Sequence, residues 1–312
     1  MRIGIHDADK TRFPNLALMK LSAWHKAKGD IVKLYDPLFA SCFDTVYSSK
    51  VFTFTPEDLE LIGNVEKGGT GYKLFHTLPE EIEHICPDYS LYDVNYSVGF
   101  VTRGCPRHCQ WCIVPDKEGD IRKHADVNEF LRHQDVVLMD NNILASEHGI
   151  QQIEKLAKLG VKVDFNQGLD ARLIDDQVAH LLSKLRWIRY IRLSCDTLSQ
   201  LPEIQKAVTL LRWYNANPAN IFVYCLVKDV QEALERVKAL KGLYLQVFAQ
   251  PYRDFDTNTD PTKEQKKFAR WVNHKAIFKS VAWKDYKVNV KGHNNAFAGD
   301  ANPQANLSLS FR

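Results

Sequence analysis

Long apolar runs are absent from this sequence of 312 residues, and its formal net charge is only +3. A helix that crosses a membrane needs roughly 18 or more apolar residues in succession, and no segment reaches that length. The first ten residues, MRIGIHDADK, also lack the apolar core of a signal peptide. So small a net charge requires no polyanionic partner. These absences favour a cytoplasmic globular protein.

A disulfide framework is also missing, because the seven cysteines are odd in number and irregularly spaced. In a reducing compartment, clustered thiols usually bind metal or take part in chemistry. Three thiols fall within eight residues, at Cys105, Cys109 and Cys112, in the segment RGCPRHCQWC. The remaining cysteines are far away in sequence, at positions 42, 86, 195 and 225.

The C-x-x-x-C-x-x-C spacing suits two kinds of metal centre. A structural zinc site needs four ligands, and His108 is the nearest candidate for the fourth. His108 directly precedes Cys109, however, which makes it awkward for both side chains to reach one ion. An iron–sulfur cluster held by three thiolates would leave one iron without a protein ligand. The spacing favours the cluster, and zinc stays the alternative.

From residue 96 onward, strand-like and helix-like segments alternate. About six β–α units in a row predict parallel strands joined by right-handed crossovers, hence an α/β fold and an open, partial (β/α)6 barrel. The expected strands are 96–104, 135–142, 161–170, 188–196, 220–227 and 242–253. The expected helices are 147–160, 175–187, 201–216, 229–240 and 262–278.

Polar residues gather where these strands end, which is where parallel α/β folds place their chemistry. Such groups at the ends of most strands predict a cofactor pocket, although Asp196 could instead cap the following helix. The candidate cofactor-binding residues are Trp111, Asp140, Asn141, Asn142, Asn166, Gln167, Arg172, Ser194 and Asp196.

The segment from about Tyr96 to Arg253 resembles the radical S-adenosylmethionine superfamily, whose signature C-x-x-x-C-x-x-C follows the first strand of a partial barrel. The resemblance implies a 4Fe–4S cluster on Cys105, Cys109 and Cys112, with S-adenosylmethionine on the remaining iron. It also implies reductive cleavage to a 5′-deoxyadenosyl radical that abstracts hydrogen from a substrate.

The same resemblance implies roles for the other candidate residues. Trp111 stands at the family's aromatic position. The Asp140–Asn142 stretch stands where the family binds the methionine amino group, and Ser194 and Asp196 would reach the ribose or carboxylate. The strand that includes Val223–Val227 would meet the adenine. An electron donor such as flavodoxin or ferredoxin is the expected partner. The sequence does not identify the substrate.

The cysteine segment is also similar to that of the methylthiotransferases, which modify tRNA or a ribosomal protein. Those enzymes carry three further cysteines in their N-terminal domain, whereas only Cys42 and Cys86 stand there in this sequence. A modifier of tRNA or protein, whether methylthiotransferase-like or methylase-like, is therefore the alternative enzyme. A zinc or nucleic-acid-binding protein without catalytic activity is the alternative of another class.

Residues 1–95 resemble the Rossmann-like, cobalamin-binding-like domain that precedes many radical enzymes. Strands are expected at 1–7, 30–36 and 43–49, with helices at 16–29 and 55–62. The D-x-H-x-x-G motif for cobalamin is missing, so cobalamin is a second candidate cofactor without its usual histidine. Gly68, Gly69 and Gly71 either let the backbone approach a cofactor or form a turn.

Residues 96–280 form the expected barrel domain, and 281–312 a C-terminal extension. Lysines and aromatic residues are frequent from Lys263 to His293. This composition suits a nucleic-acid surface, but its helical period favours an amphipathic helix with a lysine face and a packed aromatic face.

Overall fold

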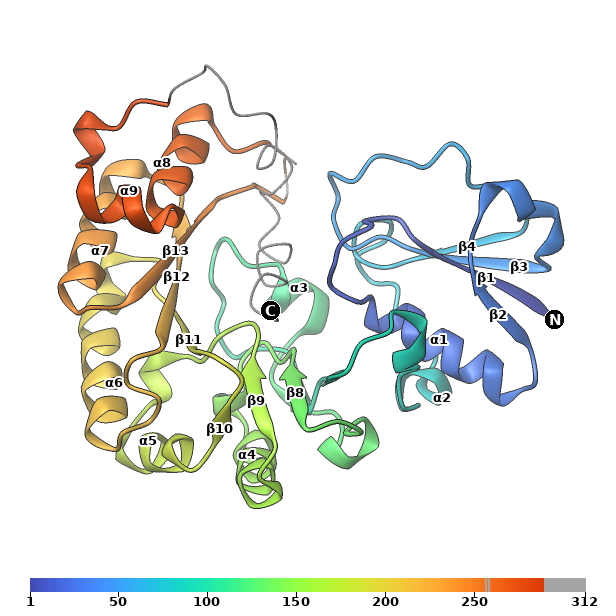
Figure 1. Ribbon diagram of the computed structural model, residues 1–312, viewed down its shortest axis with the longest axis horizontal. Coiled ribbons are helices and arrows are strands. Elements are labelled where there is room, and N and C mark those ends of the chain that lie inside the picture. The colour runs from blue at the N-terminus through green and yellow to red at the C-terminus, as the bar shows by residue number, and fades with distance from the viewer. Residues whose placement is uncertain (256, 258, 289–312) are drawn as a thin grey trace. The chain divides into compact units, whose positions relative to one another are not determined.

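The computed structural model describes residues 1–255, 257 and 259–288, drawn in colour in Figure 1. The chain divides into two compact units, Met1–Phe100 with Ala125–Val136, and Val101–His124 with Val137–Arg312. Both are mixtures of helices and strands, and most of the strands are parallel. Within the described ranges, none of the helices is long and apolar enough to span a bilayer. The domain boundaries at 95 and 280 stay predictions.

The first unit contains a four-stranded parallel sheet with the order β2-β1-β3-β4. Its strands are β1 (Arg2–Asp7), β2 (Ile31–Leu34), β3 (Thr45–Ser49) and β4 (Val65–Gly68), and β5 (Ser97–Gly99) also lies in this part of the chain. Its helices are α1 (Leu16–Ala27) and α2 (Glu80–Glu83).

Helix α1 begins where Asn15 accepts a hydrogen bond from the Leu18 amide through its side chain. The helix packs on β1, where Ile3 and Ile5 form a buried cluster with Leu18. Asn15 also donates to the Ser49 hydroxyl over 2.9 Å, which ties the start of α1 to the end of β3. The amino-terminal end of α1 is thereby held at the carboxyl end of β3.

His6 lies at that edge of the sheet and is 5% exposed. Its Nδ1 is 2.9 Å from the Ser48 hydroxyl, and its Nε2 is 3.1 Å from Asp58 Oδ2. Ser48 in turn is 3.0 Å from the Tyr72 hydroxyl. His6 is therefore a buried histidine whose two ring nitrogens are both used within the protein.

The glycines that follow β4 pack against the chain itself. Gly69 has a φ of +93°, and a Cβ there would collide with the Lys50 carbonyl oxygen. A Cβ on Gly71 would likewise collide with the Phe52 carbonyl oxygen. The two glycines are thus required for a close turn between two loops, which agrees with the simpler of the two interpretations of this segment.

Lowering the pH is expected to destabilise the first unit through His6. Burial lowers the pKa of His6, although its hydrogen bond to the Asp58 carboxylate acts in the opposite direction. The folded state therefore binds this proton less readily than the unfolded chain, whose pKa is about 6.5. The contribution of His6 to stability is present above that pH and is lost as the pH falls below it.

Urea unfolding at pH 7.5 and 5.5 measures this loss. The variant His6→Gln keeps a polar group near Asp58 but cannot titrate, so it should lose less stability than the wild type over this interval. Equal losses in both proteins would show that His6 does not govern the pH dependence.

The second unit contains two parallel sheets and one antiparallel hairpin. Its strands are β6 (Thr102–Arg103), β7 (Arg122–Lys123), β8 (Asp135–Leu138, which begins at the unit boundary), β9 (Lys162–Phe165), β10 (Arg186–Trp187), β11 (Ile191–Ser194), β12 (Ile221–Val227) and β13 (Gln246–Pro251). Its helices are α3 (Val114–Glu118), α4 (Glu147–Leu159), α5 (Asp176–Ser183), α6 (Leu201–Trp213), α7 (Val230–Gly242), α8 (Lys263–Asn273) and α9 (Lys275–Ser280).

One sheet holds β8, β9 and β10, and the other has the order β11-β12-β13. A single parallel bridge between Leu169 and Leu193 connects them, with the Leu169 amide donating to the Arg192 carbonyl over 2.7 Å. Helix α7 packs on β12 and helix α8 on β13 (Figure 1). Strands β8 and β9, and strands β11 to β13, are thus neighbours in their sheets and consecutive in the chain. Closure of the two sheets into a partial barrel stays a prediction.

Burial alternates along β12. Ile221, Val223, Cys225 and Val227 are buried, and the last three have exposed fractions of 0%. The residues between them, Phe222, Tyr224 and Leu226, are half-buried. Successive side chains of a strand point to opposite faces, so one face of β12 packs under the helices and the other is more open.

An ion pair is buried on this second face. Arg192 of β11 donates from Nε and Nη2 to Asp164 of β9 over 2.6 and 2.7 Å. Its Nη1 donates to the Tyr224 hydroxyl of β12 over 3.2 Å. Arg192 and Asp164 are each 2% exposed. The pair therefore links three strands across the junction of the two sheets.

Four expected elements differ in the structure. The helix expected at 175–187 ends at Ser183, and Arg186–Trp187 form β10. The expected helix at 55–62 is absent; in this segment Asp58 is bound by His6 and Lys10, and Leu59 is exposed, so no apolar helix face is buried there. The strand expected at 96–104 is split into β5 and β6. The helix expected at 262–278 breaks at His274, whose ring caps α9 by accepting from the Ile277 amide.

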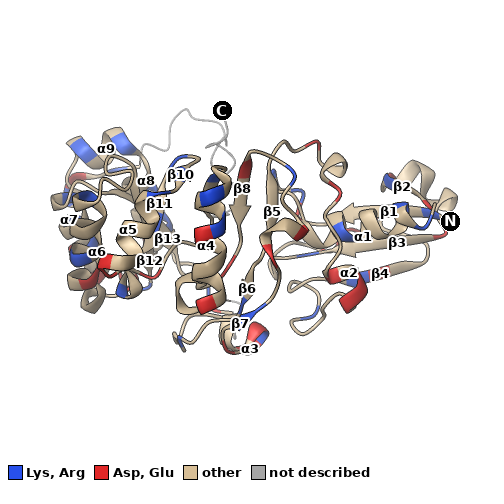
Figure 2. Ribbon diagram, turned by 90° about the horizontal axis from the view of Figure 1, so that it is seen from below, with Lys and Arg blue, Asp and Glu red and all other residues tan. Residues whose placement is uncertain are grey.

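The lysine- and aromatic-rich segment contains α8 and α9. Its rings are buried, with exposed fractions of 0% for Phe268 and 4% for Trp271. Lys275 and Lys279 give α9 its blue colour in Figure 2. The rings that would stack on bases thus pack inside the protein, as expected of an amphipathic helix. Positions 289–312, most of the expected C-terminal extension, lie outside the described residues.

Candidate functional site

The three clustered cysteines lie on a loop whose two ends are joined. The loop leaves β6 and returns through α3 to β7, and these two strands pair in antiparallel fashion. Arg103 donates from Nε and Nη2 to Glu118 over 2.9 and 2.8 Å. The amide of Cys105 donates to the Gly119 carbonyl over 3.1 Å. The loop is therefore closed at its base by the protein's own contacts.

Gly104 is the residue at which β6 turns into the loop. It has a φ of +82°, and a Cβ there would collide with the carbonyl oxygen of Asp120. Glycine is required on both grounds, since other residues rarely adopt this φ and none would fit. The position of the first cysteine directly after this turn is thus fixed by the backbone.

The thiols of Cys105, Cys109 and Cys112 are half-buried and influence one another. Burial raises the pKa of Cys109 and Cys112, and the charge of Cys105 raises both further. In the part of the chain that the structure describes, no three His, Cys, Asp or Glu side chains are arranged to hold a metal ion. Thiols bind metal as thiolates. A metal ion bound by these three cysteines would therefore have to displace their protons and bring the sulfur atoms closer together.

Asn142, which follows β8, connects the cysteine loop to a neighbouring loop. Its Nδ2 is 3.5 Å from Cys105 Sγ and 3.3 Å from Asp170 Oδ2. Its Oδ1, and the Oδ1 of Asn141, are buried without a hydrogen-bond partner within the described ranges. An unsatisfied buried oxygen costs about 1–3 kcal/mol. Two such oxygens, one of them on the residue that contacts Cys105, are places where a ligand could donate hydrogen bonds.

Asp170 is the central acceptor of this region, and the sequence analysis missed it. Arg172 donates to both of its oxygens from Nε and Nη2, over 2.7 and 3.0 Å. Arg107, from inside the cysteine loop, donates from Nε over 3.0 Å. Burial by itself would raise the pKa of Asp170, but the two arginines bring it below its usual value. Burial and the charges of Asp170 and Asp196 raise the pKa of Cys109, whereas Arg172, one of these two arginines, lowers it.

Asp140 is already bound by the chain. Its Oδ1 accepts hydrogen bonds from the amides of Val101 and Thr102, over 3.1 and 2.5 Å, and from the Thr102 hydroxyl over 2.6 Å. Burial raises the pKa of Asp140 to about 6, although these bonds favour the charged form. In this structure the carboxylate holds the turn between β5 and β6, which explains why the expected single strand is divided there.

Asp196 follows β11 and is held from both sides. Its Oδ1 accepts from the Leu226 amide over 2.9 Å, and its own amide donates to Gln200 Oε1 over 2.5 Å. Burial raises the pKa of this carboxyl group. Gln200, rather than Asp196, contributes to the cap of the following helical turn. The second carboxylate oxygen, Oδ2, accepts no hydrogen bond from any of the described residues, so it is available to a ligand.

The other candidate residues lie at neighbouring strand ends. Ser194 is half-buried at the end of β11, on the same face as Arg192. Asn166 is buried with its Nδ2 3.4 Å from Met139 Sδ, whereas Gln167 is exposed. Trp111 is half-buried in the cysteine loop, where Lys228 Nζ lies 5.5 Å from its ring centroid.

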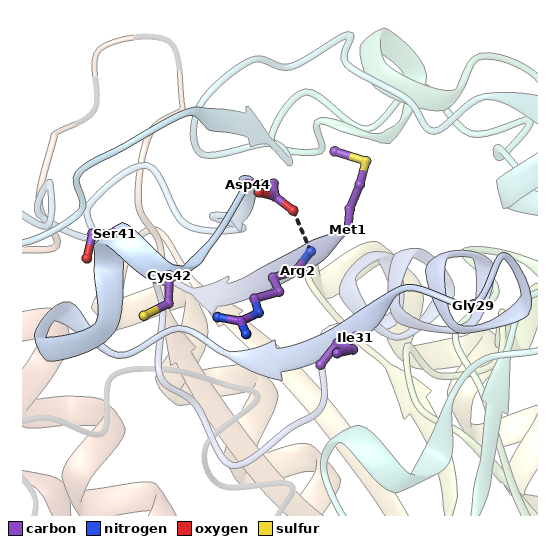
Figure 3. Close-up of a pocket in the computed structure, with 7 residues that line it drawn as sticks. All are labelled: Met1, Arg2, Gly29, Ile31, Ser41, Cys42 and Asp44. Atoms are coloured by element: carbon purple, nitrogen blue, oxygen red, sulfur yellow. Dashed lines mark hydrogen bonds between the residues drawn. The ribbon is translucent and has the colours of Figure 1, made fainter.

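A separate hollow of about 510 Å³ lies in the first unit, at the amino-terminal edge of β1 and β2 (Figure 3). The Arg2 amide donates to Asp44 there over 2.7 Å, and Cys42 is exposed on its rim. The hollow is lined by Met1, Arg2, Gly29, Ile31, Ser41, Cys42 and Asp44. None of the predicted cofactor-binding residues belongs to it.

No known family model matches the chain, and no curated protein sequence matches it either. Among solved structures, the chain is similar to SuiB of Streptococcus suis bound to S-adenosylmethionine, with a TM-score of 0.43 and 12% identity over 60% of this chain and 48% of that one. A second structure of SuiB gives a TM-score of 0.42 and 12% identity. The matched region thus spans about half the length of SuiB.

Proposed function

We propose that this protein is a radical S-adenosylmethionine enzyme that binds a 4Fe–4S cluster through Cys105, Cys109 and Cys112. The main observation behind the proposal is a set of three metal-binding thiols without a fourth ligand, together with buried side-chain oxygens that lack hydrogen-bond donors. Three thiols on one closed loop supply three ligands and no fourth. Asn142 contacts Cys105, and the buried Oδ1 atoms of Asn142 and of the preceding Asn141 have no donor among the described residues.

These features fit the methionine end of S-adenosylmethionine. Its amino group carries N–H donors of the kind that the two amide oxygens lack. Arg107 and Arg172 place positive charge near the thiols, and such charge favours the thiolate form that binds metal. When bound, the cluster and S-adenosylmethionine supply reductive cleavage to methionine and 5′-deoxyadenosine, with hydrogen abstracted from a substrate.

The ribose end would lie at Asp196. Its Oδ1 is fixed by the Leu226 amide, which leaves Oδ2 to accept from a ribose hydroxyl. Trp111 would shield the reacting region from water, because its ring lies in the cysteine loop itself. Asp140 would act through the backbone, since its carboxylate holds the turn that leads into that loop.

The proposal is tested on anaerobic protein reconstituted with iron and sulfide. About four irons per chain are expected, with slow release of 5′-deoxyadenosine after addition of dithionite and S-adenosylmethionine. A flavodoxin- or ferredoxin-type protein is the proposed physiological electron donor and should replace dithionite. Stoichiometric zinc, and no 5′-deoxyadenosine from protein loaded with iron, would instead support a structural zinc site.

Replacing Asp196 by Ala is expected to weaken S-adenosylmethionine binding by roughly ten- to a hundredfold, because a charge-assisted hydrogen bond is worth about 1.5–3 kcal/mol. Iron content should stay the same, since the residue lies outside the cysteine loop. Isothermal titration with the cofactor measures the effect, and thermal unfolding of the same variant is the control. Lower stability with unchanged affinity would make Asp196 a structural residue only.

A further inference from the structure

Helix α7 carries a charged residue in the middle of its buried face. Arg236 has an exposed fraction of 0% and lies beside the apolar cluster that includes Cys225, Ala233 and Val237. Burying a charge costs several kcal/mol unless the group is fully paired. An arginine in this place therefore needs hydrogen-bond partners; Nη1 and Nη2 have them, whereas Nε has none among the described residues.

The guanidinium group of Arg236 joins the ends of two strands. Its Nη1 donates to the Cys195 carbonyl over 2.6 Å and contacts Cys225 Sγ at 2.9 Å. Its Nη2 donates to the Leu226 carbonyl over 2.7 Å and to Glu232 Oε2 over 2.9 Å. Cys195 follows β11 directly, and Leu226 lies near the end of β12, so one side chain joins two strand ends. These ends are also paired by the hydrogen bond from the Cys195 amide to the Tyr224 carbonyl.

Glu232 extends this arrangement to the loop after β11. Its Oε1 accepts from the Leu198 amide over 2.9 Å, while its Oε2 accepts from Arg236. Leu198 begins the short helical turn that ends at Gln200, the residue that accepts from the Asp196 amide. Glu232 and Arg236 thus hold the segment on both sides of Asp196.

All of these contacts surround Asp196 without touching its free oxygen. The Cys195 carbonyl directly precedes Asp196, and Leu226, whose carbonyl Arg236 binds, donates its amide to Asp196 Oδ1. We propose that Arg236 and Glu232 are positioning residues, which set the direction of Asp196 Oδ2 toward the ribose hydroxyls of the cofactor. This inference rests on the proposed function, and it assigns a purpose to a buried charge that packing alone would disfavour.

The test compares Arg236→Lys and Glu232→Gln with Glu235→Gln. Lysine keeps the charge at 236 but cannot donate to both strand ends at once. Glutamine at 232 keeps the shape and removes the charge that pairs with Arg236. Glu235 is exposed on the same helix, so Glu235→Gln makes the same change of charge without touching the network.

Hydrogen exchange of the Leu198 and Leu226 amides, measured without cluster or cofactor, tests the network itself. Both amides should exchange faster in Glu232→Gln and Arg236→Lys and remain unchanged in Glu235→Gln. Unchanged exchange in all three variants would overturn the inference. Because this measurement needs no cofactor, it is independent of whether the proposed function is right.

A double-mutant cycle with Asp196→Ala tests positioning against mere stabilisation. Arg236→Lys should weaken S-adenosylmethionine binding about tenfold when Asp196 is present and less than about twofold when it is Ala, since coupled residues are non-additive. Equal losses in both backgrounds would overturn positioning through Asp196. If Arg236→Lys does not fold, Glu232→Gln, at a half-buried position, completes the same cycle. Failure of the wild type to bind S-adenosylmethionine would reject the proposed function instead.

Discussion

Replacing any one of Cys105, Cys109 or Cys112 by Ala is expected to abolish the iron–sulfur cluster and all cleavage of S-adenosylmethionine. In the proposed site each thiol supplies one ligand, and the described residues place no fourth cysteine nearby that could substitute. The broad brown absorbance of the reconstituted protein and its iron content measure the loss. Activity should fall to the background of the assay rather than by a modest factor.

The other cysteines provide the controls for this prediction. Cys42 is exposed and Cys86 is half-buried, and both belong to the first unit. Cys42→Ala and Cys86→Ala should keep the full absorbance and iron content. Loss of the cluster in either control would reveal a second metal site, and its retention in Cys109→Ala would remove that residue from the ligand set.

Replacing Asp164 by Ala is expected to destabilise the second unit by about 3–5 kcal/mol, because it leaves the charge of Arg192 buried and unpaired. Both side chains are 2% exposed, so water cannot replace the lost carboxylate without opening the structure. Urea unfolding of the wild type and the variant measures the difference. A cost below about 1 kcal/mol, the usual value of an exposed pair, would show that the site is hydrated.

A double replacement separates the cost of the unpaired charge from the loss of the pair itself. Asp164→Leu combined with Arg192→Met removes both charges and keeps apolar volume, so it should recover most of the lost stability. Asp260→Ala is a surface control in the same unit, since Asp260 pairs with Arg253 and Lys266 while about two-thirds of its side chain is in solvent. A double variant as unstable as Asp164→Ala would indicate that shape, not charge, is decisive.

The order of strands and helices in the second unit could be predicted because each element carries its own period and its own boundary residues. Helix α4 is an example, since it runs from the Ser146 cap to Gly160 with a φ of +67°. The cysteine loop was equally visible, because three thiols within eight residues form a local signal. Such features depend on neighbours in sequence, which is the information that a single sequence contains.

The partners that complete the site are distant in sequence, and this is why they were missed. Asp170 is 63 residues from Arg107, and Cys195 is 41 residues from Arg236. Neither aspartate nor arginine is unusual at a loop or on a helix, so composition gave no signal. Asp140 was found as a polar residue at a strand end, but its bonds to the Thr102 and Val101 amides appear only once the strands are in place.

The junction of the two sheets, where Leu169 and Leu193 form one bridge, is expected to constrain how the sequence of this protein evolves. Backbone pairing between the two sheets is sparse there, and the Asp164–Arg192 pair crosses the same junction. Replacing either residue alone would leave its partner as an unpaired charge in a buried site. A chain that lost the two charges one at a time would therefore pass through an unstable variant. The two positions should therefore be inherited together: related chains are expected to carry both charges or neither, and mixed pairs should be rare.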